Sequence, residues 1–282
     1  MPTETATVPE GPADIEVHRD DQGVATVEIR RGPDNYLDTA VLSDLADVLD
    51  VLEGDITCRA IVLVSQGKHF CAGARLSRAV DDLPTGDVNP LYEQVTRLFA
   101  GTVPIIAAVQ GAAIGAGLGL ALAADFRVAA PEARFAATFA RLGFHQGFGL
   151  SVTLPRVVGA QHATEMFYTG SRVTGEQALR IGLCDRLVPA DQLRAEAHDF
   201  AVEIASSAPL AVRAIRRTMR GDLAALVKAA TELEHREQQV LRRTDDYREG
   251  VAAPARRPPP EVHGQRTTGP PPPPPRPQAN PN

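Results

Sequence analysis

Short apolar runs alternate with amphipathic segments along the first two thirds of the chain. Residues 24–30 alternate apolar and polar side chains, as half-buried strands do. Residues 60–64 read Ala-Ile-Val-Leu-Val, a continuous apolar run that is typical of a strand buried on both faces. Residues 105–109 repeat this pattern, and residues 126–129 follow as another short strand. The alternation predicts an α/β core in which several strands are parallel.

The segment between the first two strands is expected to be helical. Apolar residues recur at helical spacing through residues 41–52, and Asp38 or Thr39 stands where a helix cap is needed. Gly54 is expected to end this helix. The glycine-rich stretch after residue 109 predicts a turn, followed by a helix of small residues to about residue 124.

The later part of the chain reads as helical. Thr174 and Gln177 fit a capping box at the start of a short helix, after which residues 183–188 resemble a strand. Beyond it the pattern is helical to about residue 243, with Asp191 and Asp222 as expected caps and Pro209 in the first turn of the middle helix.

These patterns divide the chain into four parts. Residues 1–14 are polar and predict a disordered tail, residues 15–190 an α/β core, and residues 191–262 a helical C-terminal region. Residues 263–282 form a proline-rich tail that includes six consecutive prolines, which favour an extended polyproline segment over helix or sheet.

Composition excludes several classes of function. The formal net charge is −6, which gives no support to nucleic-acid binding. The three cysteines lie far apart without metal-ligand spacing, and the first residues contain no apolar stretch typical of a signal peptide. The apolar stretch at residues 105–124 is interrupted by Gln110 and several glycines, so a membrane span is not expected. We therefore expect a cytoplasmic protein without a metal.

Two glycine-rich loops carry the candidate chemistry. The first covers residues 67–76 and the second residues 110–120, and each follows a buried strand and precedes a helix. Small residues leave backbone N–H groups approachable, and N–H groups at a helix start attract negative charge. Two such donors can stabilise the oxyanion that forms on a thioester, and each is worth about 3–4 kcal/mol. Either loop alone could mark only close strand–helix packing, and neither fits a nucleotide-binding motif.

Together the loops resemble those of the crotonase (enoyl-CoA hydratase/isomerase) superfamily. The resemblance rests on Phe70-Cys-Ala-Gly-Ala-Arg-Leu76, on Gln110-Gly-Ala-Ala-Ile-Gly-Ala-Gly-Leu-Gly-Leu120, and on the spacing of later segments up to Asp246-Tyr-Arg-Glu-Gly-Val-Ala252. It covers about residues 15–262. It implies a ββα spiral core, a C-terminal helical region that forms homotrimers or homohexamers, and an acyl-CoA substrate of fatty acid metabolism, with no cofactor besides that coenzyme A.

The resemblance also implies roles for individual residues. The N–H groups of Ala74 and Ala116 correspond to the oxyanion donors. The remaining substrate-binding positions are those that border the donors and those that line the acyl site, namely Ala72, Gly73, Arg75, Leu76, Gly115, Phe139 and Gln146. Arg75 stands where the family usually has Asp, so it is expected either to contact a phosphate or carboxylate or to face solvent.

The chain departs from the family where hydratases place their two glutamates. Gly119 and Phe139 occupy these positions, and Gly147 falls where dienoyl-CoA isomerases have an acid. None of these residues can move a proton. His145 aligns with a catalytic Asp of naphthoate-synthase-like members and is our candidate acid–base residue, although a histidine in a loop is commonly structural.

The other candidates have weaker claims. We expect His69 to be a packing residue and His162 and His235 to face solvent, and Cys71 is not expected to act as a nucleophile. Two main interpretations of the whole chain remain, beside a less favoured third, a proline-tailed interaction protein built on this fold. One is a lyase or isomerase of non-standard mechanism, acting by isomerisation, decarboxylation, C–C cleavage or hydrolysis; the other is a catalytically silent acyl-CoA-binding protein.

Overall fold

The computed structural model describes residues 14–74 and 89–252, so most of the two predicted tails, Arg75 and Leu76 lie outside the described residues. Its strands are β1 (Ile15–Arg19), β2 (Val24–Ile29), β3 (Ala60–Ser65), β4 (Ile105–Val109), β5 (Ala112–Ile114), β6 (Phe126–Ala129), β7 (Arg134–Ala136), β8 (Val173–Thr174) and β9 (Arg186–Leu187). Its helices are α1 (Thr39–Gly54), α3 (Pro90–Leu98), α4 (Ala116–Ala123), the 3₁₀ helix η2 (Thr138–Leu142), α5 (Leu150–Thr169), α6 (Gly175–Arg180), α7 (Leu193–Ala205), α8 (Pro209–Arg220), α9 (Leu223–Leu241) and α10 (Asp245–Ala252). The predicted α/β class is confirmed.

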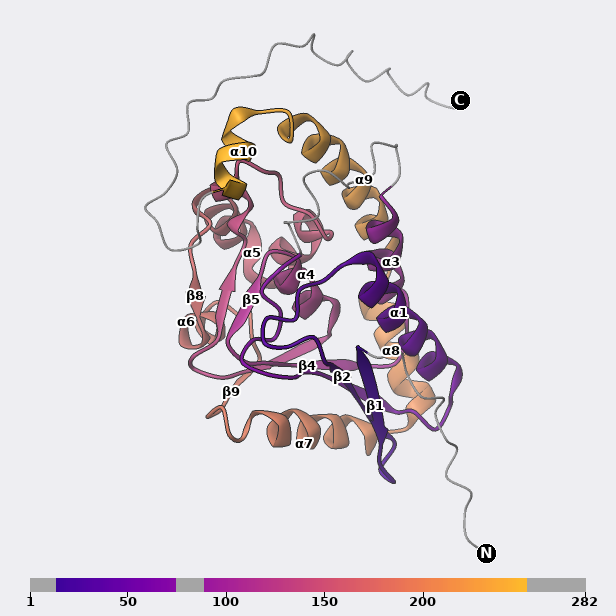
Figure 1. Cartoon of the computed structure of the whole chain (residues 1–282). Coiled ribbons are helices and arrows are strands. Elements are labelled where there is room, and N and C mark those ends of the chain that lie inside the picture. Colours follow the sequence, from indigo (N-terminus) through magenta and orange to yellow (C-terminus); the bar gives the residue numbers. More distant parts are fainter. Residues whose placement is uncertain (1–13, 75–88, 253–282) are drawn as a thin grey trace, which may run out of the picture.

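The strands form two sheets (Figure 1). The larger has the order β1-β2-β3-β4-β6-β9, in which only the β1–β2 pair is antiparallel. Every residue of β3 is buried, as its continuous apolar run predicts. The smaller sheet has the order β5-β7-β8.

The chain passes between these sheets as a spiral. It goes from β4 to β5 and then α4, and from β6 to β7 and then η2 and α5, so each turn places one strand in each sheet before a helical segment. Isolated bridges from Leu37 to Ala74 and from Cys71 to Ala113 extend the smaller sheet toward the earlier turns. This is the ββα arrangement that the resemblance implies. It brings loops from successive turns side by side.

Helix α7 covers one face of the larger sheet (Figure 1). Its Leu193, Ala197 and Ala201 pack against sheet residues such as Val62 and Ala108. The opposite face meets the main apolar core. No helix in residues 14–74 and 89–252 combines the length and the apolar character needed to cross a membrane.

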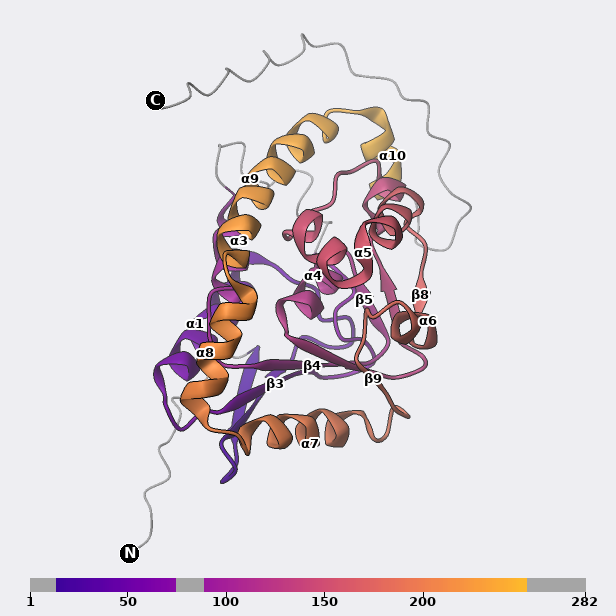
Figure 2. The same ribbon diagram turned by 180° about the vertical axis from the view of Figure 1, so that it is seen from behind.

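The C-terminal helices return to the core along α1 and α3 (Figure 2). Two arginines of helix α8 bind the same carboxylate and so anchor the helix. Arg216 Nε and Arg220 Nε donate to the two oxygens of Asp125 at 2.8 Å and 2.9 Å. Helix α9 then packs on both α3 and α5. Its buried side therefore faces the loop that joins η2 to α5.

Local signals in the sequence place several helix ends correctly. The Asp38 carboxylate accepts a hydrogen bond from Val41 N–H at 3.1 Å, which makes Asp38 rather than Thr39 the cap of α1. Thr174 and Gln177 form the predicted capping box of α6. Pro209 lies in the first turn of α8 as expected.

Other local predictions are wrong or only partly right. Asp191 does not cap α7, because residues 189–193 form a turn that delays the helix and leaves Gln192 at the cap position without a side-chain bond. Asp222 does stand at the cap of α9, but its side chain makes no capping hydrogen bond. The strand expected over residues 183–188 is only β9.

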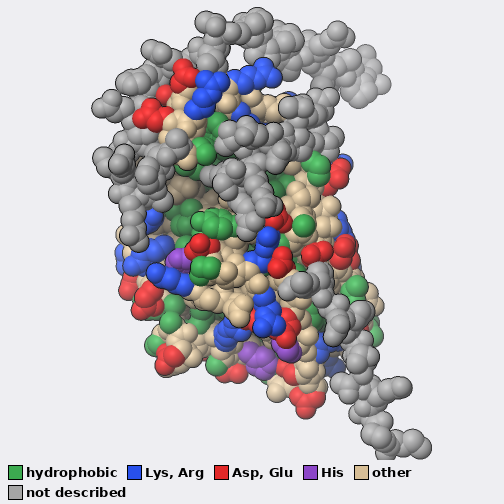
Figure 3. All heavy atoms as spheres, viewed as in Figure 1, with side chains coloured by type: hydrophobic (Ala, Val, Ile, Leu, Met, Phe, Trp, Pro, Cys, Tyr) green, Lys and Arg blue, Asp and Glu red, His purple; other side chains and the backbone are tan. Residues whose placement is uncertain are grey.

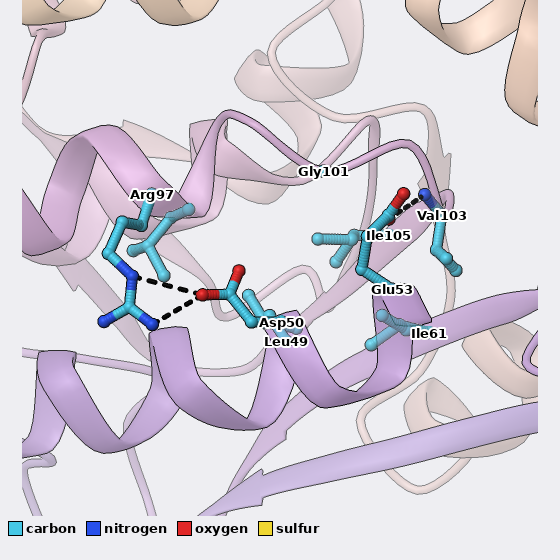
Figure 4. Close-up of a pocket in the computed structure, with 9 residues that line it drawn as sticks. Leu49, Asp50, Glu53, Ile61, Arg97, Gly101, Val103 and Ile105 are labelled. Carbon is cyan, nitrogen blue, oxygen red and sulfur yellow. Dashed lines mark hydrogen bonds and ion pairs between the residues drawn. The ribbon is translucent and has the colours of Figure 1, made fainter. Parts of the chain in front are cut away.

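Acidic and basic side chains are interspersed over the face shown in Figure 3. Many of them pair with each other, as Arg97 of α3 does with Asp47 and Asp50 of α1. The same arginine borders a narrow cavity between α1 and α3 in which Glu53 accepts N–H bonds from Thr102 and Val103 (Figure 4). The cavity measures about 10 Å³, room for a single water molecule, so this polar cluster joins two helices rather than binding a substrate.

Candidate active site

Hydrogen bonds join the two glycine-rich loops into one unit. Phe70 N–H and Cys71 N–H donate to the carbonyls of Gln110 and Ala112 at 2.8 Å and 2.9 Å, and Ile114 N–H donates back to Cys71 at 3.1 Å. Because these bonds run in both directions, the backbone of one loop fixes the position of the other.

Glycine makes this close approach possible. A Cβ atom at Gly117 would lie 2.2 Å from the carbonyl oxygen of Cys71, and one at Gly111 would lie 2.2 Å from that of Lys68. Any side chain at either position would push the loops apart. His69 lies in the same contact, where its Nδ1 accepts from Ala112 N–H at 3.1 Å, so it is a structural residue of the loop pair.

Ala74 and Ala116 present the two predicted donors. Ala116 is the first residue of α4. The cap residue, Gly115, has no side chain that could bond to the first N–H groups of the helix. The first N–H groups of a helix have no partner within it, and the helix dipole favours negative charge there. Within residues 14–74 and 89–252, neither the Ala74 nor the Ala116 N–H donates to a protein acceptor. Among the described residues, nothing therefore competes with a ligand oxygen for these two groups.

The residues beside the donors hold the loops in shape. Ala72 N–H donates to Asp34 at 2.9 Å, Gly115 N–H donates to Ala136 at 2.8 Å, and the Gly73 carbonyl accepts from Leu37 at 2.9 Å. Since these N–H groups are engaged, Ala72 and Gly115 can meet a substrate only through other atoms.

Cys71 lies beside the donors but is unsuited to nucleophilic attack. Its side chain is fully buried, its Sγ lies 3.5 Å from the Gly73 carbonyl, and burial raises the pKa of the thiol to about 12. The thiol therefore stays protonated at neutral pH. Among the described residues, no group of three or more His, Cys, Asp or Glu side chains is placed to hold a metal ion.

The structure describes the surroundings of both positions, Gly119 and Phe139, at which we expect the hydratase glutamates to be replaced. A Cβ atom at Gly119 would lie 2.5 Å from Cδ1 of Phe148, so the Phe148 ring fills the space that a side chain at residue 119 would need. Phe148 is 2 % exposed and has a left-handed backbone, with φ of 64°. The half-buried Phe139 points its ring tip toward Gly115, 3.6 Å from where a Cβ would stand.

The third acid position is also filled from elsewhere in the chain. A Cβ atom at Gly147 would lie 2.3 Å from the Tyr92 hydroxyl and 2.7 Å from the amide nitrogen of Gln238. The Tyr92 hydroxyl donates to Gln238 Oε1 at 2.9 Å, and burial raises its pKa. A phenol from α3 and an amide from α9 thus fill the space that a side chain at Gly147 would need.

His145 is half-buried in the same loop. Its Nδ1 lies 2.8 Å from the carbonyl oxygen of Gln146. The Gln146 side chain donates to Ser151 Oγ at 3.1 Å, so it supports the start of α5. Phe148 ties this loop to Gly119, which lies three residues beyond the donor Ala116 and about 4.5 Å farther along α4.

Glu234 is a buried acid that the sequence did not single out. It is 0 % exposed, and its two carboxylate oxygens accept from Gly149 N–H at 2.8 Å and Ser151 N–H at 2.9 Å. Burial raises the pKa of Glu234, although the bonds from Ser151 and Gly149 and the charge of His145 act in the opposite direction. The carboxylate caps α5 from a helix more than 80 residues away in sequence.

Of the two remaining histidine predictions, one is confirmed and the other is wrong. His162 is exposed, as expected. His235 was expected to face solvent, but it is 2 % exposed and its ring meets Tyr92 edge to face at 6.2 Å. The prediction failed because this side of α9, which also carries Glu234 and Gln238, packs into the protein.

Comparison with known proteins identifies the family of this chain. The profile of the enoyl-CoA hydratase/isomerase family matches residues 19–264. The chain is 32% identical over 244 residues to the 1,2-epoxyphenylacetyl-CoA isomerase of Escherichia coli, covering 83% of this chain and 92% of that protein.

Solved structures of similar proteins share the fold. An enoyl-CoA hydratase/isomerase from Pseudoalteromonas atlantica superposes with a TM-score of 0.78 at 29% identity, covering 85% of this chain and 95% of the other. An enoyl-CoA hydratase from Mycobacterium avium subsp. paratuberculosis gives 0.76 at 26% identity, covering 86% and 99%.

Proposed function

Because this chain belongs to the enoyl-CoA hydratase/isomerase family, we propose that it binds an acyl-CoA thioester and isomerises the acyl group through an enolate. The observation that carries this proposal is the pair of backbone donors at Ala74 and Ala116, which lack protein acceptors among the described residues and lie on loops fixed to each other. They polarise the thioester carbonyl and stabilise the negative charge that develops on its oxygen.

His145 supplies the proton transfer in this proposal. The acyl group contains a carbon–carbon double bond near the thioester. The His145 Nε2 removes a proton from a carbon that this double bond and the thioester activate, and the electron pair of that C–H bond moves into a conjugated dienolate with its negative charge on the thioester oxygen. The imidazolium then returns the proton to another carbon of the conjugated system, and the enolate collapses to the isomeric thioester. A single base that takes and returns one proton is sufficient for this reaction.

Hydration of a double bond requires two acid–base groups that the proposed site lacks. Adding water across a double bond requires groups that activate the water and protonate the carbon, and Gly119 and Phe139 replace the two glutamates that do so in family hydratases. The Phe148 ring fills the space beside Gly119, so a side chain at that position would have no room. The isomerase named among the relatives, which by its name acts on an acyl-CoA, favours the same reaction class.

A second candidate function is that of a catalytically silent acyl-CoA-binding protein. One specific observation favours it: aromatic groups fill the space beside two of the three family acid positions, Phe148 at Gly119 and Tyr92 at Gly147. Such a protein would keep the oxyanion donors for affinity alone.

Hydrogen–deuterium exchange at the α-carbon of a saturated acyl-CoA separates the two candidates. An isomerase is expected to exchange this proton at a rate that His145→Ala lowers by about 10²–10⁴-fold, the usual contribution of a general base. Calorimetric titration should show that the variant still binds acyl-CoA and that both forms bind it better than the free acid. Exchange that survives in the variant would contradict the role of His145, and absence of exchange in both forms would favour the silent binder.

Crotonyl-CoA provides a direct test of the hydration argument. We expect negligible loss of its enone absorbance, because both acid–base residues are replaced. Loss at a rate typical of hydratases would overturn the assignment of Gly119 and Phe139 to the glutamate positions.

We also propose a cytoplasmic homotrimer or homohexamer that needs no cofactor besides the coenzyme A of its substrate. Helix α8 exposes large apolar side chains at Leu210, Ile215 and Met219, which are 70%, 61% and 80% exposed in the single chain. Apolar side chains this exposed favour contact with another subunit. Sedimentation analysis of the wild type and of Met219→Glu tests this assembly, which the substitution is expected to weaken.

A further inference from the structure

Gln238 of α9 holds the carbonyl groups of two consecutive residues, His145 and Gln146. Its Nε2 donates to the carbonyl of His145 at 3.0 Å and to that of Gln146 at 3.2 Å, while its Oε1 accepts from the Tyr92 hydroxyl at 2.9 Å. The two carbonyls can only accept, so the amide nitrogen must face them. The orientation of the Gln238 amide is therefore determined by its partners.

One of these carbonyls also sets the state of the histidine ring. The Gln146 oxygen that Gln238 holds lies 2.8 Å from His145 Nδ1. Since a carbonyl oxygen only accepts, Nδ1 must carry the hydrogen in this contact. A neutral imidazole with its hydrogen on Nδ1 has its lone pair on Nε2, which makes no protein hydrogen bond within residues 14–74 and 89–252.

The rest of the loop leaves this arrangement little freedom. Gly147 has no side chain, and this absence lets the Tyr92 hydroxyl and Gln238 reach the backbone. On the far side of Gly147, Glu234 holds the N–H groups of Gly149 and Ser151. Gln238 is itself 3 % exposed, so water does not compete for its hydrogen bonds.

From these contacts we infer that Gln238 is a positioning residue, which fixes the Gln146 carbonyl so that it holds His145 with Nε2 free to accept a proton. Tyr92 in turn fixes the orientation of the Gln238 amide, because its hydroxyl donates to Gln238 Oε1. The consequence for catalysis rests on the proposed function, whereas the consequence for the histidine ring does not. The tautomer of His145 is a property of the protein without substrate.

Nuclear magnetic resonance of protein labelled with ¹⁵N-histidine measures that tautomer directly. The chain has 7 histidines, and the signal missing from His145→Ala identifies the ring of interest. We expect neutral His145 in the wild type to carry its hydrogen on Nδ1. In Gln238→Leu, which keeps a buried side chain but donates no hydrogen bond, we expect a mixture of both tautomers. Finding the hydrogen on Nε2 in the wild type, or on Nδ1 alone in a folded Gln238→Leu variant, would overturn the inference.

A second variant keeps the test decisive if Gln238→Leu does not fold. Tyr92→Phe retains the aromatic ring and removes only the hydroxyl that holds Gln238 Oε1. We expect it to shift the tautomer in the same direction by a smaller amount, because the amide can still donate but is free to turn. An unchanged tautomer in this folded variant would exclude the part assigned to Tyr92, and the wild-type spectrum alone tests the orientation of His145.

The exchange reaction then tests the effect on catalysis. Small misplacements of a catalytic group cost up to about 100-fold in rate. We expect Gln238→Leu to lower the maximal rate of α-proton exchange by about 10- to 100-fold, with little change in the acyl-CoA concentration that gives half-maximal rate.

Gln177→Leu serves as the matched control. It breaks the capping box of α6 and thus removes a glutamine hydrogen bond away from this loop. It should leave both the tautomer and the rate unchanged. If the wild type exchanges no proton, the proposed function fails while the tautomer measurement still decides the role of Gln238. An unchanged rate in a variant whose tautomer has shifted would reject the catalytic consequence.

Discussion

The two ends of the candidate site are built in different ways. At the thioester end, every donor is a backbone N–H, and the loops that carry Ala74 and Ala116 are held by bonds between main-chain atoms. At the proton-transfer end, the loop around His145 is held by the side chains of Tyr92, Glu234 and Gln238. The first end requires residues that are small, and the second requires particular side chains from distant helices.

Because of this difference, the two ends of the candidate site tolerate different substitutions. Backbone donors tolerate only substitutions that preserve close approach, because Gly111 and Gly117 leave no room for a Cβ. The side-chain supports depend instead on particular hydrogen-bonding groups, such as the Gln238 amide and the Glu234 carboxylate. Under the proposed function, thioester binding and proton transfer would therefore depend on different kinds of contact.

Apart from the loss of His145 itself, the largest effect is expected when a backbone donor is removed. Ala116→Pro eliminates the N–H of Ala116 but keeps the helix, since proline is tolerated at the first helical position. Loss of one oxyanion donor costs about 3–4 kcal/mol, so the rate of α-proton exchange should fall by about 10²–10³-fold. Exchange kinetics with a saturated acyl-CoA measure this loss.

Ala116→Ser is the matched control for that prediction. It changes the side chain and leaves the N–H in place, so its rate should remain close to that of the wild type. A proline variant that folds and still exchanges at the wild-type rate would show that Ala116 is not an oxyanion donor. Equal losses in both variants would point to packing rather than hydrogen bonding.

A smaller effect is expected at Gly119, where the Phe148 ring fills the space beside the glycine. Gly119→Ala places a methyl group 2.5 Å from the Phe148 ring, and overpacking of this kind costs about 1–3 kcal/mol. Urea denaturation should show this loss in the free energy of unfolding.

Gly54→Ala provides the comparison, because a Cβ there meets no atom within 4 Å. Gly54 is the last residue of α1, and removing a helical glycine usually stabilises a protein by about 0.5–1 kcal/mol. Opposite signs for the two substitutions would support the tight contact between Gly119 and Phe148. A Gly119→Ala variant as stable as the wild type would show that Phe148 moves aside easily.

The sequence predicts the thioester end better than the other end for a physical reason. Strands such as β3, the caps at Asp38 and Thr174, and the glycine-rich loops depend on residues within a few positions of each other. The local pattern therefore contains the information that these features need. The error at Asp191 is of the same local kind, since a turn of a few residues moved the start of α7.

Local sequence patterns could not identify the residues that hold the loop of His145. Tyr92 and Gln238 are 146 positions apart, and Glu234 lies 85 positions from Gly149, so no spacing in the sequence connects them. On a helical projection, Glu234 and Gln238 resemble the polar side of a surface helix. Only the packing of α9 against α3 and α5 buries them, and for the same reason His235 was wrongly expected to face solvent.

The smallest effect concerns the charge on Glu234. Burial raises the pKa of this carboxyl above its ordinary value of 4.5, so the folded state binds its proton more tightly than the unfolded state does. Stability from this group is then fully present below pH 4.5 and is lost as the pH rises through the folded pKa. Glu234→Gln cannot ionise. The free energy of unfolding of the wild type minus that of the variant should therefore decrease from pH 4.5 to pH 8.

Glu232→Gln, which removes an exposed carboxylate from the same helix, corrects this measurement for the change in net charge. After that correction, urea denaturation across the pH range isolates the contribution of the buried group. A difference that instead grows with pH would mean that the N–H groups of Gly149 and Ser151 stabilise the carboxylate by more than burial costs. Glu234 would then be a fixed anion at the start of α5, and the proton-transfer end would contain a permanent negative charge beside the loop of His145.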